Sequence, residues 1–574
     1  MGRVESLDGA LAARSLWRLL PFLLSGLMLL PVTVGLGLTL LPAFGYLPAL
    51  GGDSLTLRHF STLLAAPGLV HAVLVSLLTG IVAPLLALSI TFCFLAFAAG
   101  TRLERWVQRL LAPLLAIPHA AAAFGFAFLI APSGLLMRWV SPWLTGLSSP
   151  PDLLLVNDYW GLSLLGGLVS KEIPFLLLMS LAVLPQLDVQ RRVNLARSLG
   201  YRPAVAWLKT VAPGLYPLVR LPVYAVITFA SASVDVALIL GPNVPYTLSV
   251  MVLQWFNDPD LSYRFVAAAG ALLQLLVTLA ALLLWRGGEL CCVRLASPLL
   301  SNGERRRGEL CIRSCGQGGV VLAVLAACGG LLALLLNAFG GLWRFPASLP
   351  GSWSLRSWER AFAELALPLG NTLLIGLLVT VLAIVLVIAV LESEQRSRVP
   401  LPAAMLLLYV PLLVPQVAFL FGLTVAAEFV RWRPDIGLVM LAHLLFVLPY
   451  VYLSLSTTYR RLDPRWSQLG ATLGASPWRI FWRLRLPLLL APCLTAAAVG
   501  LAVSVGQYLA TLLSGAGRVP TLTTEAVALA AGGNRSIIAV WALLQAALPM
   551  LGFVLALSLP RLLWRNRRGM RAMY

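Results

Sequence analysis

Long apolar stretches alternate with short polar segments along the whole chain. Each stretch holds about 20 residues or more, which is the length that a helix needs to cross the hydrocarbon core of a bilayer. A transmembrane β-barrel would instead show strands of roughly ten residues with alternating apolar positions. The pattern therefore predicts twelve transmembrane helices, at 17–42, 69–99, 111–131, 161–184, 217–241, 264–286, 319–342, 369–391, 402–427, 437–458, 488–513 and 537–563.

Composition agrees with this pattern. Of the 574 residues, 60% are hydrophobic and 11% are charged, which is less than half the charged share of roughly 25% in soluble domains. The predicted fold class is therefore an all-α polytopic membrane protein.

The predicted helices fall into two sets of six. Between the sets, the segment 287–318 is charged, contains glycine and has no long apolar period. Such a segment is typical of a cytoplasmic linker between two packed halves, here 1–286 and 319–574. Because six is an even number, both halves insert in the same orientation and are related by a pseudo-two-fold axis along the membrane normal. A transport pathway would lie at the seam between them.

Short motifs recur in corresponding helices of the two halves. In the third helix of each half, Pro118-His119 with Gly125 recurs as Pro415-Gln416 with Gly422. The fourth helices share Ile173-Pro174-Phe175 and Leu448-Pro449-Tyr450, and the second helices open with His71-Ala72 and Asn371-Thr372.

A further repeat lies in a polar, basic loop that follows the fourth helix of each half. NLARSLGYRPAVAWLKTVAP at 194–213 aligns without a gap with QLGATLGASPWRIFWRLRLP at 468–487. Gly200 and Gly474 permit a turn with positive φ, and Pro213 and Pro487 suit the first turn of the next helix. We predict two short helices around a glycine break, lying on the membrane face and available to a partner. A simpler interpretation is a basic loop held on one side by the positive-inside rule, but duplication at matched positions favours the contact.

The spacing of this loop resembles the EAA loop of ABC importer permeases, whose pattern is E-A-A-x3-G-x9-I-x-L-P. The first copy keeps Ala196, Gly200 and Pro213, and the second keeps Gly474, Leu486 and Pro487. The acidic position holds Asn194 and Gln468, and the first alanine is Leu195 and Leu469. The resemblance implies that the loop is a coupling helix that docks on a cytoplasmic ATPase subunit. The residues implied in this contact are Asn194, Leu195, Ala196, Gly200, Tyr201, Pro203, Pro213, Gln468, Leu469, Gly470, Gly474, Ala475, Pro477 and Pro487.

Over its whole length the chain resembles the fused two-half binding-protein-dependent permeases of the iron, thiamine, sulfate and polyamine group. Within that group, the runs 504–534 and 170–178 resemble the YnjC-type permeases. The resemblance implies a type I ABC importer permease in a bacterial inner membrane, working by alternating access with two copies of a cytoplasmic ATPase and a periplasmic solute-binding protein. It does not identify the solute.

The distribution of charge predicts the topology. The formal net charge is +20, and most of the basic residues fall in segments that share one side of the membrane if the N-terminus is cytoplasmic. The positive-inside rule accounts for this excess without a nucleic-acid partner and places both termini in the cytoplasm.

The chain carries no motif for catalysis. Its two lysines, Lys171 and Lys209, do not follow a glycine, so no phosphate-binding G-x4-G-K-[ST] loop exists. We therefore expect ATP and Mg²⁺ to be bound by the partner ATPase and this chain to be a transport subunit with no cofactor of its own. The seven cysteines show neither a disulfide framework nor a zinc-type spacing.

Ionisable residues inside membrane helices are candidates for function. Lys171 and Glu172 precede Pro174 in the fourth helix and are either part of the pathway or a structural ion pair. Asp235 in the fifth helix is either a substrate or gate residue or makes an inter-helix hydrogen bond. His119, Gln416 and Gln507 are candidates for the pore lining, although hydrogen bonds between helices also explain such residues.

An alternative function is an ion-coupled secondary transporter in which Lys171, Glu172 and Asp235 form a relay. It predicts uptake by the chain alone, abolished by an uncoupler. A membrane scaffold without transport activity would have no use for paired proline-bearing helices with polar residues at matching depths.

Overall fold

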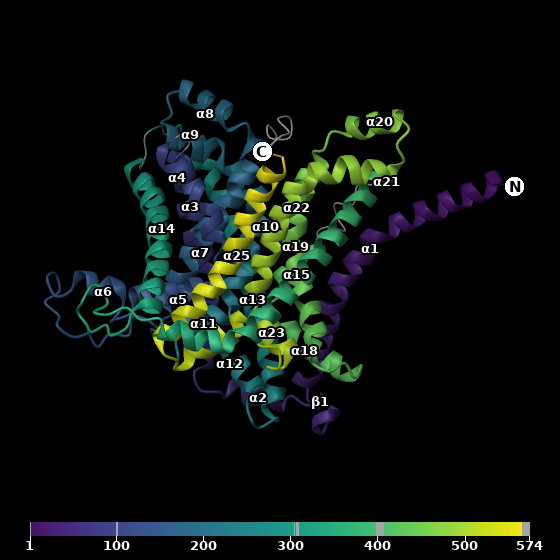
Figure 1. Cartoon of the computed structure of the whole chain (residues 1–574). Helices are drawn as coiled ribbons and strands as arrows, with labels where there is room; N and C mark the ends of the chain where they lie inside the picture. Colours follow the sequence, from purple (N-terminus) through teal and green to yellow (C-terminus); the bar gives the residue numbers. More distant parts are fainter. Residues whose placement is uncertain (1, 99–100, 304, 306–308, 398–406, 565–574) are drawn as a thin grey trace.

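The computed structural model describes the chain except residues 1, 99–100, 304, 306–308, 398–406 and 565–574 (Figure 1). The regular secondary structure of the described part is helical apart from one small antiparallel hairpin, β1 (Tyr46–Leu47) with β2 (Gly52–Asp53), and an isolated bridge between Gly340 and Trp353. Within it, eleven helices are long and apolar enough to cross a membrane, or twelve if one strongly bent pair counts as a single span. This agrees with the predicted fold class.

The helices of the first half follow the order of the predicted spans. The long ones are α1 (Gly2–Ala43), α3 (Leu69–Ala98), α4 (Arg102–Ala116), α5 (His119–Ile130), α7 (Leu162–Val183), α10 (Ala212–Ala232) and α13 (Tyr263–Ser301). The short ones are η1 (Pro48–Leu50), α2 (Arg58–Leu64), α6 (Leu135–Val140), η2 (Leu184–Leu187), α8 (Val189–Ser198), α9 (Pro203–Thr210), α11 (Asp235–Leu240) and α12 (Leu248–Phe256).

The second half repeats this order. Its long helices are α14 (Glu309–Phe339), α15 (Arg356–Ser397), α18 (Gln416–Phe429), α19 (Ile436–Arg460), α22 (Leu486–Val505) and α25 (Arg535–Leu563). Its short elements are η3 (Leu407–Tyr409), α17 (Val410–Leu413), α20 (Pro464–Thr472), α21 (Pro477–Ile480), η4 (Phe481–Arg485), α23 (Leu509–Gly515), α24 (Leu522–Ala528) and η5 (Leu529–Ala531).

The third predicted helix of each half is broken at its proline, so predicting one continuous helix was wrong. Ile117 ends α4 in an extended conformation before Pro118, and Val414 ends α17 in the same way before Pro415. A proline removes a backbone donor and pushes the preceding residue out of the helical region. In the second half the helix axis turns by 104° at this point. Positions 402–406 of the ninth predicted helix lie outside the described residues.

The fifth helix of each half is also interrupted, against the prediction of single helices at 217–241 and 488–513. One break separates α10 from α11 at 233–234, and the other separates α22 from α23 at 506–508. The carbonyl groups freed at these breaks accept hydrogen bonds: Ser249 donates to Ser233, at 2.9 Å, and Thr523 donates to Val505. Asp235 therefore begins a short helix instead of lying inside a long one.

The first helix of each half packs against the opposite half. Helix α1 lies along α18 and α15, while α14 lies along α3 and α5. The helices cross at glycines: a Cβ atom at Gly422 would lie 1.8 Å from the carbonyl oxygen of Gly35, and one at Gly125 would lie 3.0 Å from the carbonyl carbon of Gly330. Small residues permit such close approach, which explains why glycine recurs at 125 and 422.

The predicted linker is largely helical where the structure describes it. Helix α13 continues to Ser301 and α14 begins at Glu309. Only residues 302–308 therefore separate the two long helices that join the halves.

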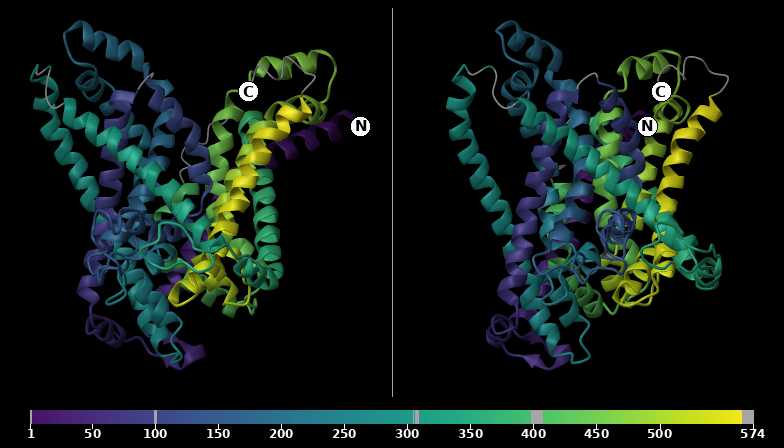
Figure 2. Two further views of the ribbon diagram at one scale, coloured as in Figure 1. Left: turned by 60° about the vertical axis from the view of Figure 1, so that its left-hand side comes forward. Right: turned by 90° about the vertical axis from the view of Figure 1, so that its left-hand side faces the viewer.

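Both repeated loops lie at one end of the helix bundle (Figure 1). Helices α8 and α9 of the first loop and α20 and α21 of the second lie at the top of Figure 1, whereas α2, β1 and α12 lie toward the opposite end. Figure 2 shows that α14 and α25 diverge toward the end that carries the loops.

Candidate functional site

The first repeated loop (194–213) and the second repeated loop (468–487) turn in the same way. Helices α8 and α20 are each followed by a glycine in the left-handed region, Gly200 with φ +86° and Gly474 with φ +77°. The amide of Gly200 donates to the carbonyl of Arg197 (2.9 Å), and that of Tyr201 donates to Ala196 (3.2 Å). The second loop repeats both bonds. Together they form a Schellman motif, which requires a residue with positive φ and therefore favours glycine.

In the second loop, the amide of Gly474 donates to the carbonyl of Ala471 (3.0 Å), and the amide of Ala475 donates to the carbonyl of Gly470 (3.1 Å). After the turn, Pro203 and Pro477 begin the next short helix, where a missing amide hydrogen is not needed. The predicted helix, glycine turn and second helix are thus present in both loops.

Two matched pairs of leucines are exposed on these loops. Leu195 and Leu199 are 60% and 64% exposed, and their counterparts Leu469 and Leu473 are 58% and 81% exposed. Residues four apart share one face of a helix, so each loop presents an apolar spot in a basic, polar surrounding. Their recurrence at matched positions makes these leucines candidates for a contact with a partner.

The loops differ in how they are held. Arg202 forms an ion pair with Glu309 (2.7 Å), and Lys209 donates to the side chain of Asn302 (2.9 Å), so the first loop contacts the connection between the halves. Arg305 lies over Gly200, whereas a Cβ atom at Gly474 would meet nothing within 4 Å.

Lys171 and Glu172 have different partners. The ammonium group of Lys171 donates to the carbonyl oxygens of Leu114 (2.8 Å), Leu115 (3.4 Å) and Ile117 (2.5 Å). These are groups that the break before Pro118 leaves without helical partners. Lys171 therefore caps the end of α4, which assigns it a structural contact.

Glu172 is buried and faces His119, with 3.5 Å between the carboxylate and Nε2. His119 begins α5, is about one-third exposed, and packs on Phe229 with ring centroids 4.5 Å apart. Asp235, also buried, interacts electrostatically with His119. Both buried acids, on α7 and α11, thus interact with the same histidine.

The second half has a neutral counterpart of this group. Gln416, at the start of α18, donates to Gln507 at the α22–α23 break, with 3.3 Å between the amide groups. The acids of the first half are within electrostatic reach of tyrosines of the second, Glu172 of Tyr450 and Asp235 of Tyr508. Glu172 and Asp235 therefore interact with residues across the seam, and Lys171, although bound to α4, lines a small cavity together with Gly330 of α14.

Two of the buried polar groups that sequence reasoning missed connect several helices. His443 on α19 contacts Ser504 and Thr511, each at 2.8 Å, and so joins α19 to α22 and α23. Glu392 near the end of α15 contacts residues of α19 and of the second repeated loop. A histidine inside an apolar run and an acid directly after one were the available signals. Within the described residues no group of three or more side chains could hold a metal ion.

Comparison with known proteins identifies the family. The model of the binding-protein-dependent transport system inner membrane component matches residues 386–563. The chain is 32% identical over 532 residues to the inner membrane ABC transporter permease protein YnjC of Escherichia coli (strain K12), covering 90% of this chain and 93% of that protein. The chain belongs to the ABC importer permease family. No solved structure matches it.

Other members of the ABC importer permease family match shorter parts of this chain. The molybdenum transport system permease protein ModB of Mycobacterium tuberculosis (strain ATCC 25618 / H37Rv) is 30% identical over 173 residues, which are 27% of this chain and 66% of ModB. The putrescine transport system permease protein PotI of Escherichia coli (strain K12) is 28% identical over 153 residues, which are 25% of this chain and 54% of PotI. These relatives are named for different solutes, so they do not indicate one for this chain.

Proposed function

We propose that this permease moves a small solute into the cytoplasm of a bacterium by alternating access. A periplasmic binding protein delivers the solute, and two copies of a cytoplasmic ATPase, which hold ATP and Mg²⁺, supply the energy. The chain lies in the inner membrane with both termini in the cytoplasm, as its distribution of basic residues favours.

The observation that carries this proposal is the pair of repeated loops at one end of the bundle. Each loop combines a glycine turn of the same geometry with two exposed leucines at the same positions. Two equivalent contacts on a pseudo-symmetric protein suit two copies of one partner. The partner we propose is the ATPase, because this chain lacks a nucleotide-binding loop.

The proposed solute pathway follows the seam between the halves. His119, Glu172 and Asp235 supply ionisable groups from the first half, and Gln416 and Gln507 supply amide groups from the second. Four of these residues, His119, Asp235, Gln416 and Gln507, lie at helix breaks, where the backbone leaves the regular hydrogen-bonding pattern, whereas Glu172 lies inside α7. Irregular backbone at membrane depth is tolerated only where protein or a water-filled cavity surrounds it.

The test is a double variant, Gly200→Glu with Gly474→Glu, expressed in the native membrane. We expect the variant to insert normally but to lose the copurifying ATPase and solute uptake, since a charge and a strained turn are placed at both docking points. The matched control is Gly51→Glu with Gly146→Glu, two glycines with positive φ and no neighbour within 4 Å, outside the loops. Normal ATPase association in the first variant would refute the proposal. Uptake without any ATPase would favour the ion-coupled alternative.

A further inference from the structure

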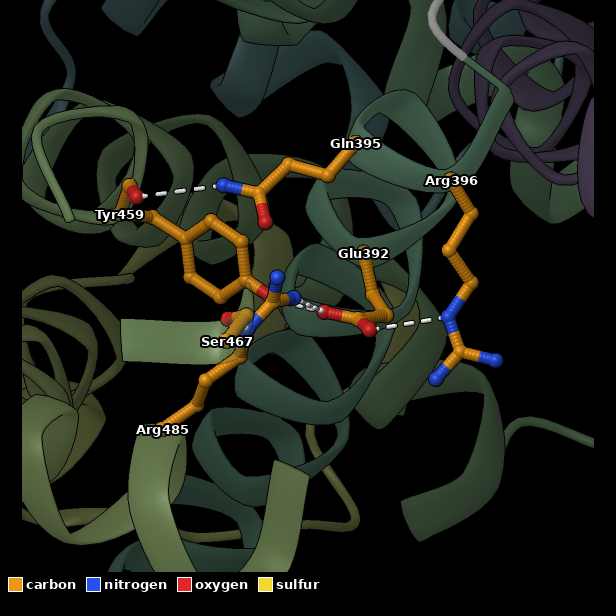
Figure 3. A network of polar contacts seen from close by, with 6 residues as sticks. All are labelled: Glu392, Gln395, Arg396, Tyr459, Ser467 and Arg485. Atoms are coloured by element: carbon orange, nitrogen blue, oxygen red, sulfur yellow. Dashed lines mark hydrogen bonds and ion pairs between the residues drawn. The ribbon is translucent and has the colours of Figure 1, made fainter. Parts of the chain in front are cut away.

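A buried carboxylate joins the second repeated loop to two membrane helices (Figure 3). Glu392, which is 6% exposed, accepts hydrogen bonds from Arg396 (2.9 Å), Arg485 (2.7 Å) and the hydroxyl group of Tyr459. Arg485 ends η4 in the loop, whereas Tyr459 belongs to α19 and Glu392 to α15. One side chain therefore connects three elements.

Arg485 also connects the two limbs of the loop. Its Nε donates to the hydroxyl group of Ser467 on α20 at 2.9 Å, while its terminal nitrogen contacts Glu392. Figure 3 shows the arginine lying between these two partners. Pulling α20 away from the bundle must therefore draw Arg485 with it or break the bond to Ser467. Pulling Arg485 away from α15 and α19 separates charges that are largely out of water. Separating buried charges is strongly unfavourable.

The corresponding position of the first half has a different chemistry. Aligning α3 with α15 at His71 and Asn371 places Phe92 opposite Glu392. This register is supported by burial, since Ala83 and Ala383 at matched positions are both fully buried.

Aligning the two repeated loops, 194–213 with 468–487, places Val211 at the position of Arg485 and Trp207 at that of Phe481. Phe92 packs edge-on against Trp207, with ring centroids 5.9 Å apart, and both Trp207 and Val211 are buried in one apolar cluster. The first loop is thus fastened to α3 by apolar packing where the second is fastened to α15 by charge.

We propose that Glu392 is a positioning residue that transmits movement of the second repeated loop to α15 and α19, and that the two halves transmit movement through chemically different joints. The ionic joint consists of Glu392, Arg485 and Tyr459; the apolar joint consists of Phe92, Trp207 and Val211. The inference rests on the proposed function for the origin of the movement, but the joints themselves are properties of this chain alone.

The first test measures amide hydrogen exchange in the full chain in lipid nanodiscs, without a partner. Glu392→Gln and Arg485→Met should each raise amide exchange at 464–485 about tenfold, and the double variant should raise it no further. Exchange at 189–210 should stay unchanged in all three variants, which shows that the fold is intact. Phe92→Ala should give the reverse pattern. Unchanged exchange in Glu392→Gln, or an equal rise in both loops, would overturn the proposal.

A rescue variant separates a transmitting contact from a merely stabilising one. Glu392→Phe with Arg485→Val places the chemistry of the apolar joint in the second half and should restore protection at 464–485. In the presence of the associated ATPase, Glu392→Gln should keep ATPase binding but lose most of the solute uptake per ATP hydrolysed, and the rescue variant should regain it. If the rescue variant restores neither the protection at 464–485 nor the solute uptake per ATP hydrolysed, an apolar joint cannot replace the ionic one, and the proposal that both joints transmit movement is contradicted. A wild-type chain that binds no ATPase would instead refute the proposed function and leave the exchange result standing.

Discussion

Truncating the exposed leucines of one loop should weaken ATPase binding by an amount set by their exposure. Full burial of a leucine side chain is worth about 2 kcal/mol, and Leu469 and Leu473 are 58% and 81% exposed in the free chain. If the partner covers that surface, replacing both by alanine removes about 2.8 kcal/mol of binding free energy, or roughly 100-fold in Kd. The variant Leu469→Ala with Leu473→Ala is thus expected to bind much more weakly than the wild type.

The first loop gives an internal comparison. Leu195 and Leu199 expose slightly less surface, 60% and 64%, so their double alanine variant should lose slightly less affinity. The assay is titration of the purified ATPase onto the full chain in nanodiscs. The control is Leu295→Ala near the end of α13, where the leucine is 67% exposed but belongs to neither loop. The reasoning is refuted if both loop variants bind within twofold of the wild type, or if the control loses as much as they do.

Three further predictions concern the membrane region. Lys171→Met should lower the free energy of unfolding in detergent by about 2 to 4 kcal/mol, because three carbonyl groups lose a charged donor at membrane depth. An unchanged denaturation midpoint would show that the contact does not stabilise α4. Gly422→Leu should prevent α1 from crossing α18 and should lower the melting temperature far more than Gly37→Leu, where a Cβ atom on α1 would meet nothing within 4 Å. Equal melting temperatures would contradict the crossing. Asp235→Asn should reduce uptake severalfold while ATPase binding stays normal, and a variant with wild-type uptake would remove Asp235 from the pathway.

Much of this architecture is visible in the sequence because hydropathy and local turn chemistry determine it. Glycine at 200 and 474 marks a left-handed turn that only a few residue types adopt easily, so the form of both loops could be predicted residue by residue. The exposure of Leu195 and Leu469 follows from their place in a polar loop. Family membership then follows from the same loop together with the two-half repeat.

The breaks inside the membrane were harder to predict because hydropathy averages over about 20 residues. Pro118 and Pro415 were visible, but a proline can kink a helix or end it, and the choice depends on partners such as Lys171 that satisfy the freed carbonyls. At Ser233 no proline marks the break, which is held by Ser249 from another helix.

Contacts between distant segments left almost no sequence signal. Gly125 and Gly422 recur in the repeat, yet nothing in their local pattern shows that each receives the first helix of the opposite half. Glu392 looks like an ordinary acid at a helix end, and its distant partner Arg485 is found only when the loop folds back on α15. Such contacts depend on topology, which periodicity does not encode.

The most direct test of the central claim uses a photoreactive phenylalanine analogue placed at Leu199 or at Leu473 of the full chain in its native membrane. Both positions should cross-link to the same ATPase subunit, identified by mass spectrometry, because both loops present their leucines at the same end of the bundle. Products with lipid alone, or with a periplasmic protein at either position, would contradict the account.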